Sequence, residues 1–92
     1  MNEILEKAIE TYGEDAQIDK AIEEMSELTK ALLKDRHRTK DYEEDILFDA
    51  VAEEMADVHI MLEQLSMIYN NAEQVCRYQN EKLKRLEKRL NG

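Results

Sequence analysis

The chain contains no proline and only two glycines in 92 residues, so very little in it would interrupt a helix. Its single phenylalanine, four tyrosines and lack of tryptophan leave too few of the residues that favour strands to build a sheet. Hydrophobic residues make up 42% of the chain, which is enough for a core. A chain of this length has room for one domain. We therefore expect a single all-α domain over residues 1–92.

Apolar residues recur at helical spacing in four segments. The spacing predicts helices over residues 2–12, from Asp15 to about residue 33, from Asp45 to about Asn70, and from Asn71 to the end at Asn91-Gly92. We expect Gly13 to cap the first helix and Asp15 to cap the start of the second, with a polar loop over 35–42. Asn71 and Gln74 have the spacing of a capping box. Four helices with short connections predict a small antiparallel four-helix bundle.

The net charge and the apolar content indicate which partners the chain is not expected to bind. The chain has 22 acidic and 13 basic side chains and a formal net charge of −9, which disfavours binding to a nucleic-acid polymer. No segment approaches the roughly 20 apolar residues that a membrane span needs, so we expect no membrane partner. Cys76 has no second cysteine to pair with, and the first residues lack the basic start of a signal peptide. The expected location is therefore the cytoplasm.

Two octapeptides in the chain have the same pattern. Residues 21–28 read Ala-Ile-Glu-Glu-Met-Ser-Glu-Leu, and residues 51–58 read Val-Ala-Glu-Glu-Met-Ala-Asp-Val. Both give a small or apolar residue, an apolar one, two glutamates, methionine, a small residue, an acid and an aliphatic residue. Each copy falls within a predicted helix. The repetition indicates two helices that present the same chemistry to a shared site.

Each octapeptide places two carboxylates three residues apart, where they are neighbours on one helix face: Glu24 with Glu27, and Glu54 with Asp57. Helical periodicity places Glu54 within the apolar stripe of its helix and Asp57 near the edge of that stripe. Carboxylates beside a core are costly unless protonation, a salt bridge or a cation neutralises them. Carboxylate oxygens suit Mg²⁺, Mn²⁺ or Ca²⁺, and no histidine or cysteine joins them to make a zinc site. One such acidic string is expected by chance in so acidic a chain, but two matching copies favour a metal site.

The string Glu-Glu-x-x-Glu at 23–27 together with Glu-x-x-Asp at 54–57 resembles the paired signature of the MazG-like nucleotide pyrophosphohydrolases. These belong to the all-α nucleoside triphosphate pyrophosphatase superfamily. Residues 56–65 are similar to short phage and bacterial members, and the likeness extends over about residues 18–90. The resemblance implies an all-α NTP pyrophosphatase-like fold that assembles as a homodimer or homotetramer. It also implies Mg²⁺-dependent hydrolysis of the α–β phosphoanhydride of (deoxy)nucleoside triphosphates to a monophosphate and pyrophosphate.

The same resemblance assigns roles to particular acids. It makes the metal ligands Glu24, Glu27, Glu54 and Asp57. The metal it implies is Mg²⁺, with Mn²⁺ as a substitute. Glu23 and Glu53 are then the candidate catalytic residues, with an outer role or a role in activating the attacking water.

Family members also carry a basic motif on the last helix, Lys-aromatic-x-x-Arg preceded by asparagine. Here Lys82 and Arg85 are similar, but they are three residues apart instead of four, and leucine replaces the aromatic residue. Both spacings keep the two cations on one helix face. The resemblance therefore makes this pair a candidate for binding substrate phosphates, with a solvated charged face as the equally weighted alternative.

Two other functions stay open on the sequence. One is a non-catalytic helical interaction module whose acidic face binds a basic partner, and the other is a protein that binds nucleotide without hydrolysing it. Inward-facing carboxylates at Glu54 and Asp57 fit the enzyme, whereas an outward acidic face fits the module. The periodicity favours the enzyme, with a nucleoside triphosphate as its substrate.

Overall fold

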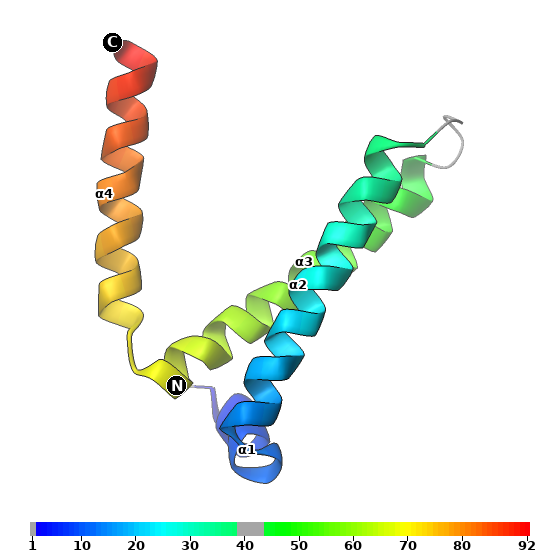
Figure 1. Ribbon diagram of the computed structural model, residues 1–92, viewed down its shortest axis with the longest axis vertical. Helices are drawn as coiled ribbons and strands as arrows, with labels where there is room; N and C mark the ends of the chain where they lie inside the picture. The colour runs from blue at the N-terminus through cyan, green and yellow to red at the C-terminus, as the bar shows by residue number, and fades with distance from the viewer. Residues whose placement is uncertain (1, 39–43) are drawn as a thin grey trace.

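A computed structural model describes residues 2–38 and 44–92, and this part of the chain is helical, with no strand (Figure 1). Its helices are α1 (Glu3–Tyr12), α2 (Glu14–Arg36), α3 (Glu44–Tyr69) and α4 (Ala72–Asn91). The all-α prediction is confirmed, and every predicted helix is present with ends displaced by no more than a few residues. No helix in the described ranges has both the length and the apolar character to cross a bilayer.

A single glycine separates the first two helices. Asn2 caps α1, since its side-chain oxygen accepts hydrogen bonds from the backbone N–H groups of Ile4 and Leu5. Gly13 ends α1, donating its N–H to the Ile9 carbonyl at 2.8 Å, and its φ of 92° is one that residues with a side chain rarely adopt. Gly13 is also the N-cap of α2, so the predicted capping role of Asp15 is wrong. Asp15 instead lies in the first turn of α2, where its charge is favourable at the positive end of the helix dipole.

The core lies between α2 and α3, which run antiparallel as a long hairpin, and α1 packs against both near one end (Figure 1). Small side chains on α2 allow close approach, and Ala21 is 1% exposed. Met61 of α3 and Leu5 of α1 complete the apolar centre together with Ala31. Gln64 is also buried, at 2% exposed. This narrow core holds α2 and α3 side by side.

Charged side chains join the two helices at the other end of the hairpin. The Arg38 guanidinium pairs with the carboxylates of Asp35 and Glu44, the latter at 3.6 Å, and lies 5.3 Å from the centre of the Phe48 ring. The predicted loop over 35–42 begins too early, because α2 continues to Arg36 with basic side chains in its last turn. Its positions 39–42 lie outside the described residues. Arg38 therefore ties the end of α2 to the start of α3.

The fourth helix leaves the other three. Asn70 adopts a left-handed φ of 51° and ends α3, and α4 then projects away from the hairpin (Figure 1). Asn71 is the N-cap of α4 but its side chain makes no capping hydrogen bond, so the predicted capping box with Gln74 is wrong. Every residue of α4 is exposed. In place of the predicted four-helix bundle, three helices pack together and α4 projects away from them. The radius of gyration, 16.7 Å, accordingly exceeds the roughly 12 Å of a compact chain of this length.

Candidate metal centre

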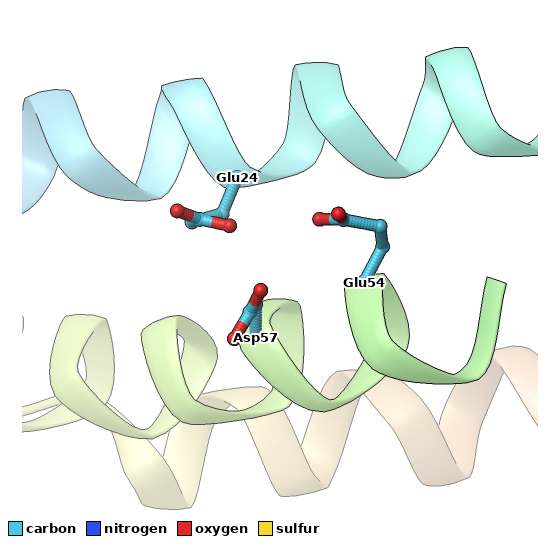
Figure 2. Close-up of side chains that lie close together, drawn as sticks. All are labelled: Glu24, Glu54 and Asp57. Carbon is cyan, nitrogen blue, oxygen red and sulfur yellow. The ribbon is translucent and has the colours of Figure 1, made fainter. Parts of the chain in front are cut away.

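Three carboxylates from two helices meet between α2 and α3. Glu24 comes from α2 and Glu54 and Asp57 come from α3, and Figure 2 shows them pointing toward one another. One carboxylate oxygen from each lies within 4.8 Å of the others. Each of the three side chains is partly buried. We call these three residues the acidic cluster.

The acidic cluster lies where the antiparallel hairpin brings the two octapeptides together. Buried Ala21 precedes Glu24 by one turn on α2, and buried Met61 follows Asp57 by one turn on α3. The apolar contacts that hold the helices together are therefore adjacent to the three acids. Glu54 and Asp57 are both partly buried, as their positions in and beside the apolar stripe of the helix predicted.

Glu54 is the least well compensated member of the cluster. Its Oε2 atom is buried and has no hydrogen-bond partner among the described residues. Burial raises the pKa of the Glu54 carboxyl above its usual value, and the negative charges of Asp57, Glu24, Glu27 and Glu53 raise it further. A buried anionic oxygen without a partner is costly. A cation bound at this point would therefore stabilise the arrangement of the three acids.

Lys20 lies at the edge of the cluster, and the sequence reasoning missed it. Its ammonium pairs with Glu24 Oε1 at 3.1 Å, across one turn of α2. The pKa of Lys20 is raised, chiefly by its hydrogen bond to Glu24, then by the charges of Glu23 and Glu24 and more weakly by Asp57 on α3. The i, i+4 spacing of Lys20 and Glu24 was the available signal.

The other predicted acids lie around the cluster and not in it. Glu27 is one turn beyond Glu24, has a 43% exposed side chain and pairs with Lys30 at 3.3 Å. Glu23 and Glu53 are exposed, each one residue before a member of the cluster. The structure thus brings together three of the four predicted ligands, with Glu27 near enough for its charge to affect the pKa of Glu54.

The predicted phosphate-binding cations lie elsewhere. Lys82 and Arg85 are on α4, both exposed, and α4 projects away from the hairpin that carries the cluster. Within one chain, the structure does not bring these two side chains to the acidic cluster.

The donor set fits a hard divalent cation. Oxygen ligands of one Mg²⁺ ion lie about 3 to 4 Å apart, since each is about 2.1 Å from the metal. The three cluster oxygens, all within 4.8 Å of one another, need little movement to reach that spacing. An ion there would also give Glu54 Oε2 the partner that it lacks. Glu24, Glu54 and Asp57 are therefore the residues that would hold the ion.

Comparison with protein-family models, with curated proteins and with solved structures finds no match to this chain.

Proposed function

We propose that this protein is a Mg²⁺-dependent nucleoside triphosphate pyrophosphohydrolase. It would cleave the α–β phosphoanhydride of (deoxy)nucleoside triphosphates, with water as the nucleophile, to give a monophosphate and pyrophosphate. The observation that carries the proposal is the convergence of Glu24, Glu54 and Asp57 from the two octapeptides on one partly buried point. This inward orientation favours the enzyme over the acidic interaction module, which would need its acids on an outer face.

The cluster residues have a clear task in this reaction. A bound Mg²⁺ ion would neutralise charge on the phosphates and lower the pKa of a bound water. Glu24, Glu54 and Asp57 fix their carboxylates on two packed helices, which gives precise placement. Because the site is partly buried, charge interactions there are less screened than on an open surface.

Glu23 and Glu53 are the proposed water-orienting residues. Each is exposed and directly precedes a cluster residue, so each carboxylate is open to solvent beside the cluster. A carboxylate in that position would accept the proton of the attacking water, while the bridging oxygen leaves with pyrophosphate. Glu27, paired with Lys30 one turn away, would add negative charge next to the cluster.

We further propose that a second copy of the chain completes the assembly. The accessible surface of 7686 Å² exceeds the roughly 5,600 Å² of a compact monomer of this mass, and the difference is larger than one partner's share of a standard interface. α4 carries six basic and three acidic side chains, whereas the rest of the chain carries seven basic and nineteen acidic ones. This complementarity favours docking of α4 on another copy of the chain. Lys82 and Arg85 would then lie near the phosphates of a substrate bound at the acidic cluster of that copy.

The first experiment is a measurement of pyrophosphate release from a panel of ribo- and deoxynucleoside triphosphates, with and without Mg²⁺. Magnesium-dependent release with a monophosphate product is the expected result. Asp57→Asn should lower turnover by about 100-fold or more, since it removes one ligand charge. Glu63→Gln, an exposed change on the same helix, is the matched control and should leave turnover unchanged.

The result that would overturn the proposal is equally definite. If folded wild-type protein released no pyrophosphate from any nucleotide, hydrolysis would be rejected. A metal titration of the same sample would then separate the two alternatives. Binding of Mn²⁺ and nucleotide would indicate a binding protein, and binding of neither would indicate the acidic interaction module.

A further inference from the structure

Among the described residues, Lys20 is the one whose cationic side chain forms an ion pair with a member of the acidic cluster. Its Nζ lies 3.1 Å from Glu24 Oε1, and the Glu24 side chain is only 12% exposed while that of Lys20 is 50% exposed. The ammonium therefore has one side against the cluster and the other open to solvent. A ligand that approaches the cluster from solvent would meet this group.

The chemistry of the two partners makes the ion pair exchangeable. Glu24 is an oxygen ligand that a divalent cation would share, so metal binding and the ammonium compete for the same carboxylate charge. When a metal ion binds the Glu24 carboxylate, the ion pair between Glu24 and Lys20 is weakened. The three N–H donors of the Lys20 ammonium are then available beside the site. Phosphate oxygens are strong acceptors for such a group, with charge-assisted hydrogen bonds.

We propose that Lys20 is a phosphate-binding residue of this site, one that holds Glu24 in the metal-free protein and pairs with a triphosphate oxygen when metal and ligand are bound. The proposal rests on the proposed function in taking a triphosphate as the ligand. It assigns phosphate binding to a residue of α2 that already pairs with a cluster member, whereas Lys82 and Arg85 lie on α4, which projects away from the hairpin.

The test uses Lys20→Met, which keeps most of the stem of the side chain and removes the charge. Mn²⁺ binding without nucleotide is measured by calorimetry, followed by binding of inorganic triphosphate at saturating Mn²⁺. Loss of the competing ammonium should tighten Mn²⁺ binding about two- to fivefold. Loss of a charge-assisted hydrogen bond should weaken triphosphate binding about tenfold. A purely structural helix pair would produce neither shift.

Two further variants make the test specific. Lys20→Arg keeps the positive charge and should bind Mn²⁺ and triphosphate nearly as the wild type does. Lys34→Met, an exposed change on the same helix outside the cluster, is the matched control and should change neither affinity. Circular dichroism of all variants checks that α2 stays helical.

Both shifts in Lys20→Met are required. If either the Mn²⁺ or the triphosphate affinity stays at the wild-type value, the proposal is overturned. Turnover of nucleoside triphosphates is followed separately in the same samples. Both shifts in a protein without turnover would reject hydrolysis and still establish Lys20 as a phosphate-binding residue.

Discussion

Glu54 combines a buried, unpartnered oxygen with four acidic neighbours, so its charge opposes folding when no metal is bound. Burial raises the pKa of Glu54 in the folded protein above its ordinary value of 4.5, so the folded state holds this proton to a higher pH than the unfolded state does. Stability of the metal-free protein should therefore fall as pH rises above 4.5 through the raised pKa of the folded state.

Glu54→Gln isolates this effect, because it removes the charge and keeps the shape. The variant should melt at a higher temperature than the wild type at pH 7 without metal, and the difference should vanish near pH 4. Added Mg²⁺ should raise the melting temperature of the wild type and not of the variant. The measurement is the melting temperature of the wild type and of Glu54→Gln at a series of pH values, with and without Mg²⁺. A variant less stable than the wild type at pH 7 would contradict this account of Glu54.

The two exposed glutamates allow a second prediction at the residue scale. If Glu23 or Glu53 orients the attacking water, replacing that one with glutamine should lower kcat by about 100-fold. Mn²⁺ affinity should change little, because neither residue belongs to the cluster. Steady-state kinetics together with a Mn²⁺ titration separate the two effects. Full activity in both variants would assign water activation to another group.

At the scale of elements, α4 is the helix that carries an apolar stripe although all its residues are exposed in the single chain. Leu83 and Leu86 are about half exposed in the single chain, although helical spacing puts both on an apolar stripe. Leu86→Ser on a solvated helix should change stability by less than about 0.5 kcal/mol. On a helix docked against a second copy it should cost about 2 kcal/mol or more and weaken the assembly.

We expect the larger effect. Sedimentation velocity over a concentration series should show Leu86→Ser dissociating at concentrations where the wild type stays associated. Glu87→Gln, the next position on α4 and also exposed, is the control and should sediment as the wild type does. Identical sedimentation of Leu86→Ser and wild type would show that this stripe is not an interface.

For the whole molecule, the decisive question is whether one site uses two chains. A dimer whose sites pair the cluster of one chain with α4 of the other allows complementation. Glu54→Gln and the double variant Lys82→Ala/Arg85→Ala should each be inactive or nearly so. An equimolar mixture, refolded together, should recover about a quarter of wild-type activity, since half of the dimers then hold one intact site. No recovery would place both functions within one chain.

Helix positions follow closely from the sequence, because helix formation depends on neighbours in the chain. Apolar spacing, the scarcity of glycine and the lack of proline predicted all four helices, and Gly13 was correctly expected to end the first. The wrong predictions concerned helix caps, because backbone geometry determines which residue caps a helix. Gly13 replaced Asp15 as the cap of α2, and Asn71 starts α4 without a side-chain hydrogen bond.

The sequence alone also determined that both octapeptides present acids, since residues three apart share a helix face whatever the tertiary structure. Only the tertiary structure decided which acids meet. The packing of α2 on α3 gathers Glu24, Glu54 and Asp57 and leaves Glu27 paired with Lys30. The direction of α4 likewise depends on the backbone at Asn70, whose left-handed φ helical periodicity does not specify.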